Sequence, residues 1–146
     1  MYQRAFKVCF LHRGKLYSEL TAHPRNPLKA REWIAAPRDG YWVAVKTLRQ
    51  ARYWLHELLP NAYKIRVPVP KVYISSTESS PPWKTDLKYV TYRPLIVEVE
   101  SPKPWTTVGA LFDRMVSVGE LVWAKRLESL AVFASIMRVK RFAEIA

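Results

Sequence analysis

The chain has 146 residues, 49% of them hydrophobic, and its 24 lysines and arginines against 12 acidic residues give a net charge of +12. This length fits one domain with its own core, and the apolar and aromatic content excludes an intrinsically disordered chain. No run approaches the about twenty apolar residues of a membrane span, and no secretion signal opens the chain, so we expect a cytoplasmic protein. A single cysteine, Cys9, excludes an internal disulfide and zinc sites built on cysteine pairs.

The first part of the chain predicts a hairpin and a short third strand. Residues 4–11 carry apolar side chains on both sides and predict a strand that is buried on at least one face. A basic turn at 12–15 leads to a return strand over 16–20. Prolines exclude a helix interior or a central strand from 21–28, and residues 31–35 can form a short strand before the next turn.

A strand, a helix and a second strand then follow in unbroken succession. Aromatic and β-branched residues at 41–45 predict the first strand. Thr47 can cap a helix from Leu48 to Leu59, because apolar residues recur there at helical spacing. Residues 62–67 alternate strictly between apolar and basic side chains, which predicts a strand with a basic outer face.

Prolines interrupt the strands that the middle of the chain predicts. Pro68 and Pro70 are expected to break one ladder, and Pro94 is expected to separate two strands. The strands predicted here cover residues 71–74, 87–92 and 95–100. Residues 75–85 are rich in serine and proline and predict an exposed loop.

Glu98 and Glu100 form the one carboxylate pair that projects from a single strand face. Such a pair could hold a divalent cation or divide acid and base roles, which makes it a weak candidate metal site. The other interpretation is that the two glutamates face solvent or pair with a cross-strand cation, for which Lys88 and Arg93 are near in sequence. The three histidines lie at no metal-ligand spacing, so no catalytic residue and no cofactor are assigned.

The last third of the chain predicts helices. Two nearby prolines mark a boundary between a sheet domain, 1–104, and a helical segment, 105–146, packed on it within one structural domain. Thr106 can cap a short helix over 106–116, and a longer helix is expected over 120–142. Apolar residues extend nearly all round the longer helix, so it must be covered by the sheet or by a second copy. A homodimer through residues 120–142 is therefore one hypothesis.

Together these elements predict a single α+β domain. We expect a mixed or antiparallel sheet of about six strands with the helix at 48–59 packed on one face. The C-terminal helical pair is expected to complete the core or to form a dimer.

The positive charge favours a polyanionic partner, with nucleic acid first and a membrane surface second. Cations and aromatic residues interleave in the first half of the chain, and phosphate contact and base stacking require this combination. The candidate nucleic-acid-binding residues are Arg4, Lys7, Arg13, Lys15, Tyr17, Arg31, Arg49, Arg52, Lys64 and Arg66. The other interpretation is that the charge serves solubility and the aromatic residues form the core.

A series of short motifs runs through the first half: a strand, a serine-bearing turn, a tryptophan, a glycine before an aromatic strand, a helix start, and a further strand. The residues are Phe6-Lys7-Val8, Tyr17-Ser18, Trp33, Gly40-Tyr41-Trp42-Val43, Thr47-Leu48-Arg49-Gln50-Ala51 and Tyr63-Lys64-Ile65. This series, from Phe6 to about Val72, resembles a small uncharacterised αβ domain of bacteriophage and archaeal-virus proteins. The resemblance implies a viral or mobile-element origin, hence a host cytoplasm, and no known activity. The aromatic, proline-rich and arginine-rich composition is also similar to that of proteins from hyperthermophilic archaea and their viruses.

Three functional hypotheses follow. The leading one is a small basic protein that binds nucleic acid with little sequence preference and without catalysis. The second is an interaction or structural protein that oligomerises through its apolar C-terminal helix. The third is a metal-dependent enzyme that uses Glu98 and Glu100.

Overall fold

A computed structural model describes residues 2–18, 27–36, 40–59, 65–70, 87–107 and 124–145, with the backbone alone at 65–70, 87–90 and 145. The strands of this described part are β1 (Gln3–His12), β2 (Lys15–Tyr17), β3 (Ile34–Ala35), β4 (Trp42–Ala44), β5 (Ile65–Pro70), β6 (Leu87–Ser101), β7 (Val132–Ala134) and β8 (Ile136–Ile145). Its helical segments are α1 (Leu48–Tyr53), the π-helical turn η2 (Trp54–Leu58) and the 3-10 turn η6 (Glu128–Leu130).

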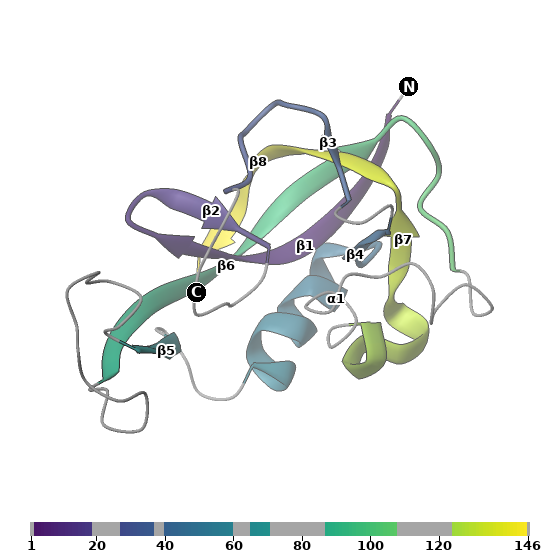
Figure 1. Cartoon of the computed structure of the whole chain (residues 1–146). Coiled ribbons are helices and arrows are strands. Elements are labelled where there is room, and N and C mark those ends of the chain that lie inside the picture. Colours follow the sequence, from purple (N-terminus) through teal and green to yellow (C-terminus); the bar gives the residue numbers. More distant parts are fainter. Residues whose placement is uncertain are drawn as a thin grey trace.

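The main sheet is built around β6 (Figure 1). Five strands follow one another in the order β2, β1, β6, β8 and β3, a sixth strand, β5, also pairs with β6, and all these pairs are antiparallel. A second sheet consists of the antiparallel pair β4 and β7. Phe6 and Val45 join the two sheets, because each backbone N–H donates to the other's carbonyl at 2.8 Å. The predicted α+β class and the mainly antiparallel sheet are confirmed.

β6 runs without a break through Pro94, where the sequence predicted two separate strands. One edge of β6 pairs with β1 from Arg93 to Ser101. The other edge pairs with β5 as far as Tyr92 and with β8 from Leu95 onward, so Pro94 lies where the partner changes. A missing backbone N–H need cost no ladder hydrogen bond at that point, and the strand continues.

β5 likewise continues through Pro68 and Pro70, which were expected to break it. Within the described residues β5 pairs with β6 alone, and proline is tolerated in a strand that pairs on one edge. The strand predicted at 71–74 and the loop predicted at 75–85 lie outside the described residues.

The helix predicted over residues 120–142 is wrong. Residues 124–127 form one helical turn that η6 extends, and the chain then enters β7 and β8. In β8 the buried Met137 and Val139 alternate with the less buried Arg138. This period of two is that of a strand, and the apolar residues from Val132 onward belong to strands of both sheets. The homodimer hypothesis loses its basis, because the described residues from 124 to 142 do not form the long helical surface that it required.

The predicted boundary after residue 104 does not separate a helical segment from the sheet. Thr106, expected to cap a helix, instead exchanges backbone hydrogen bonds with Phe133 of β7 at 3.0 and 2.8 Å. The remainder of that predicted helix lies outside the described residues. β8 pairs directly with β6, so both parts of the chain contribute to the main sheet.

The predicted central helix begins at the predicted cap. Thr47 Oγ1 accepts from the Gln50 N–H at 3.1 Å, and Gln50 Oε1 accepts from the Thr47 N–H at 3.3 Å, which forms a capping box. α1 and η2 together cover Leu48 to Leu58, close to the predicted bounds. No helix in the described part of the chain is long and apolar enough to cross a membrane.

Two hydrophobic clusters occupy the two faces of the sheet. In the first, Phe6 and Val8 of β1 pack with Ala51 and Trp54 of the helix, which lies beneath the sheet in Figure 1. The second cluster contains Cys9, which is fully buried and therefore acts as a small core residue. The end of the first face that carries the glutamates of β6 is polar, and it forms the candidate site.

Candidate functional site

Glu98 and Glu100 lie on one face of the sheet, as their alternation predicted. Ile96 precedes them on that face and packs in the first cluster, whereas Val97 and Val99 belong to the second. Both glutamates are buried. A buried carboxylate is costly unless a counter-charge or hydrogen bonds stabilise it, so its partners define the site.

The strand register supplies arginines from both neighbours of β6. On β1, Arg4 lies opposite Glu100. On β8, Arg138 lies opposite Glu100 and Arg141 lies opposite Glu98. Arg138 and Arg141 are three residues apart on β8, whereas the glutamates opposite them are two residues apart on β6. The pairing register therefore shifts between the two pairs. This β-bulge brings Arg138 and Arg141 to the same face, although their odd separation would place them on opposite faces of a regular strand.

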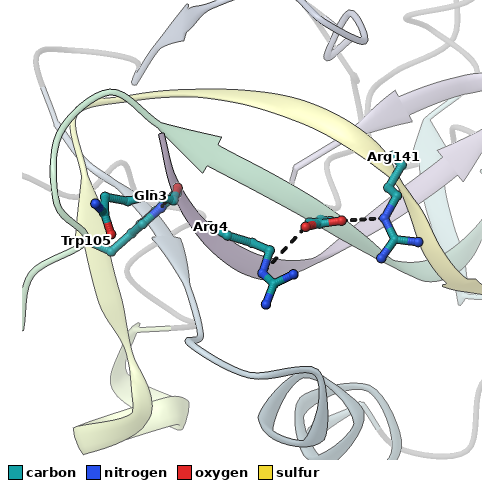
Figure 2. A network of polar contacts seen from close by, with 5 residues as sticks. Gln3, Arg4, Trp105 and Arg141 are labelled. Atoms are coloured by element: carbon teal, nitrogen blue, oxygen red, sulfur yellow. Dashed lines mark hydrogen bonds and ion pairs between the residues drawn. The ribbon is translucent and has the colours of Figure 1, made fainter. Parts of the chain in front are cut away.

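Two arginines share the carboxylate of Glu98. Arg4 Nε lies 3.6 Å from Oε1, and Arg141 Nε donates to Oε2. The Glu98 side chain is 2% exposed, whereas those of Arg4 and Arg141 are 65% and 62% exposed. Figure 2 shows both guanidinium groups beside this carboxylate, with their terminal nitrogens pointing away from it. The arrangement presents two cationic groups to solvent above one buried anion.

Arg138 joins Glu100 to two exposed aromatic rings. Its Nε donates to Glu100 Oε1 at 2.5 Å, and its guanidinium carbon lies 4.7 Å from the Tyr2 ring centroid and 4.3 Å from the Trp33 ring centroid. The two rings contact each other edge to face, with centroids 5.0 Å apart. These distances fit cation-π contacts.

We name the surface formed by Tyr2, Arg4, Trp33, Arg138 and Arg141 the arginine-aromatic patch. Its three guanidinium groups face the two buried carboxylates, so the patch carries one net positive charge. Both aromatic rings are exposed large hydrophobic groups, which is unusual for a purely structural cluster.

The start of β1, with Arg4 in the strand and Tyr2 just before it, is held by a residue that is distant in sequence. Trp105 Nε1 donates to the backbone carbonyl of Gln3 at 3.1 Å (Figure 2). The segment after β6 thereby fixes the backbone between the two patch residues.

Searches of protein-family models, curated proteins and solved structures found no match for this chain. The site therefore has to be interpreted from its own chemistry.

A metal-binding role for Glu98 and Glu100 is not favoured by their surroundings. Each already accepts from an arginine, and the described residues contain no group of three His, Cys, Asp or Glu side chains that could hold a metal ion. Cross-strand pairing was the other interpretation of these glutamates, and it is the observed one. The observed partners are Arg4, Arg138 and Arg141, which lie on the two strands that flank β6.

Two of the predicted nucleic-acid-binding residues are not on the surface. Lys7 is fully buried and donates to the Val43 carbonyl at 2.7 Å. Tyr17 is buried against Tyr92, with ring centroids 6.1 Å apart. Neither side chain can contact a ligand in this fold, because β1 and β2 are buried on both of their faces at these positions.

The other predicted cations fall into separate places. Arg4 belongs to the patch, and the backbone N–H of Arg31 donates to the Val139 carbonyl at 3.0 Å, next to Arg138. Four of the predicted cations are exposed away from the patch, namely Arg13 and Lys15 at the hairpin turn and Arg49 and Arg52 on α1, of which Arg52 pairs with Glu144 at 2.9 Å. Lys64 lies outside the described residues, and Arg66 is described only by its backbone pairing with Thr91.

Four patch residues were not among the predicted binding residues, namely Tyr2, Trp33, Arg138 and Arg141. The two arginines lie within residues 120–142, for which the sequence predicted a helix. The available signal was the alternation of Met137 and Val139 with charged residues, because this alternation predicts a strand over 136–145. The bulge that brings both arginines to one face has no signal in the sequence.

Proposed function

We propose that the protein binds nucleic acid through the arginine-aromatic patch, with little sequence preference and without catalysis. The observation that carries this proposal is the pair of exposed guanidinium groups beside the buried Glu98, of which Arg141 donates from Nε to Glu98 and Arg4 lies at ion-pair distance, 3.6 Å. The terminal nitrogens of a guanidinium group match the oxygens of a phosphate and can bind it with two parallel hydrogen bonds.

The number of arginines supports a role beyond neutralisation. One buried carboxylate needs one cation, yet Glu98 contacts two, both of them more than half exposed. Because Arg141 Nε donates to Glu98, the orientation of its guanidinium group is set before a ligand arrives, and the ion pair with Glu98 keeps the guanidinium group of Arg4 beside it. Preorganisation of this kind lowers the entropy lost on binding.

The remaining charge supports a polyanion as the ligand. Exposed cations at the hairpin turn and on α1, together with the net charge of +12, attract an extended anion from a distance. Phosphate contacts position a nucleic acid but do not read its bases, so little sequence preference is expected.

A fluorescence-anisotropy titration tests the proposal. Labelled single-stranded DNA, single-stranded RNA and duplex DNA are titrated with the protein at about 50 mM and about 200 mM salt. We expect micromolar or tighter binding at the lower salt concentration and at least about tenfold weaker binding at the higher one, because bound phosphates release counterions.

Matched charge variants locate the surface. Arg4→Gln with Arg141→Gln removes two charges from the patch, and Lys29→Gln with Lys125→Gln removes two exposed charges elsewhere. We expect the first pair of substitutions to weaken binding much more than the second. A denaturation experiment on each variant confirms that it is folded before binding is compared. Arg4→Lys with Arg141→Lys keeps the charge but loses the fork, so its affinity should lie between the two. Absence of binding to every nucleic acid at low salt, or equal losses from both glutamine pairs, would contradict the proposal.

A further inference from the structure

We infer that the patch takes single-stranded rather than duplex nucleic acid, with unpaired bases stacking on Tyr2 and Trp33 while the phosphates contact Arg4 and Arg141. This inference rests on the proposed function and names the ligand class for the same site.

The two rings are exposed yet held in place. Tyr2 is 49% exposed and Trp33 is 37% exposed, although each lies against the guanidinium group of Arg138 and against the other ring. A ring fixed in this way loses little freedom when a base stacks on it. Base stacking on aromatic side chains tolerates any sequence, because every base has a π face.

The aromatic and phosphate-binding groups lie close enough together for one short stretch of single-stranded nucleic acid to contact both. Arg4, Glu100 and Arg138 form one cross-strand row. Glu98 and Arg141 belong to a second row, which is two residues away along β6. The two rows are about 7 Å apart, since a strand rises about 3.4 Å per residue. The rings at Tyr2 and Trp33 contact the Arg138 end of the patch.

A duplex would use only part of this surface. Its base faces are covered by neighbouring base pairs, so it offers phosphates to the arginines and nothing to the rings. A single strand offers both groups, which matches the combination of cationic groove and aromatic platform that sequence-tolerant single-strand binding employs.

An abasic strand separates stacking from phosphate contact. We would compare an oligothymidine with an abasic oligonucleotide of equal length and equal phosphate number, and with a duplex, by anisotropy at low salt. The oligothymidine is expected to bind about tenfold more tightly than the abasic strand, and more tightly than the duplex.

Tyr2→Ala and Trp33→Ala are each expected to weaken oligothymidine binding about tenfold and to leave abasic-strand binding unchanged. Tyr2→Phe keeps the ring and should retain the affinity of the unmodified protein. Phe142→Ala is the matched control: Phe142 is also 49% exposed, but it lies opposite Val97 and hence on the other face of the sheet. This control should change neither affinity.

The possible failures are distinguishable. Equal affinity for the oligothymidine and the abasic strand, or equal losses for both strands in Tyr2→Ala, would overturn base stacking while the proposed function stands. Tighter binding to the duplex would also overturn the inference. Binding to anionic lipid vesicles but to no nucleic acid would overturn the proposed function itself, and the inference with it.

Discussion

Lys7 is a buried cation among apolar neighbours. Its ammonium group donates to the Val43 carbonyl at 2.7 Å and lies 5.9 and 5.6 Å from the ring centroids of Trp42 and Trp54. These partners replace part of the hydration that the ammonium group loses on burial. The four-carbon stem also fills core volume, so the residue acts through packing as well as through charge.

Two substitutions separate packing from charge at this position. Lys7→Met keeps most of the side-chain volume and removes the ammonium group, whereas Lys7→Ala also leaves a cavity. We expect Lys7→Ala to lower the free energy of unfolding by at least about 2 kcal/mol more than Lys7→Met does. Urea denaturation followed by circular dichroism measures both values. Equal losses in the two variants would show that the stem contributes little.

The capping box of α1 offers a test at the scale of one element. Thr47→Ala removes the hydroxyl that accepts from the Gln50 N–H and leaves the first turn of a short helix without a side-chain cap. The free energy of unfolding is expected to fall by about 1 kcal/mol. Thr47→Ser retains the acceptor and should lower the free energy of unfolding by clearly less. Urea denaturation of both variants makes the comparison. A serine variant as unstable as the alanine variant would contradict a capping role.

β8 is a central strand of the main sheet, paired with β6 on one edge and with β3 on the other. A chain truncated after Pro104 would lose β7 and β8 and expose one edge of β6 together with the buried Glu98. We expect this truncated chain to show no cooperative unfolding transition in urea, whereas the full chain does. A cooperative transition at a similar midpoint would mean that the first 104 residues form a domain by themselves.

The elements that the sequence predicted correctly are those whose signals are local. The hairpin, β4 and the start of α1 each follow from a turn, an aromatic run or a cap within a few residues. β8 was mistaken for a helix because the continuous apolar run before it, residues 130–134, fits a buried strand and a buried helix equally well over a short window. The alternation at Met137 and Val139 is brief, and the partner that establishes the strand, β6, lies about forty residues away in sequence.

The patch was harder to predict than the fold. Its residues come from β1, from the segment before β3 and from β8, so no sequence window contains it. The charged residues Glu98 and Arg4 were identified individually. Their association depends on the register of three strands and on one bulge, and neither can be obtained from composition or spacing.

At the scale of the whole molecule, the excess of positive charge predicts how binding responds to salt. A plot of the logarithm of the binding constant against that of the salt concentration has a slope of about −0.7 per phosphate contact for single strands. Removing Arg4 and Arg141 together should therefore make the slope shallower by about 1.4. The slope is measured by anisotropy at a series of salt concentrations. The Lys29→Gln and Lys125→Gln control should leave it nearly unchanged, and a slope equally unaffected in the patch variant would exclude direct phosphate contact there.

The position of β6 also constrains when the sheet can assemble. Its two long partners are β1, at Gln3–His12, and β8, at Ile136–Ile145, so the strands that flank it come from opposite ends of the chain. Ordering such distant segments costs loop-closure entropy before their contacts form, which slows folding. During synthesis on the ribosome, β6 emerges before β8, so one edge of β6 stays unpaired until β8 has been translated. We therefore expect slow maturation for a chain of this length, with the unpaired edge of β6 as the segment most exposed to self-association in the meantime.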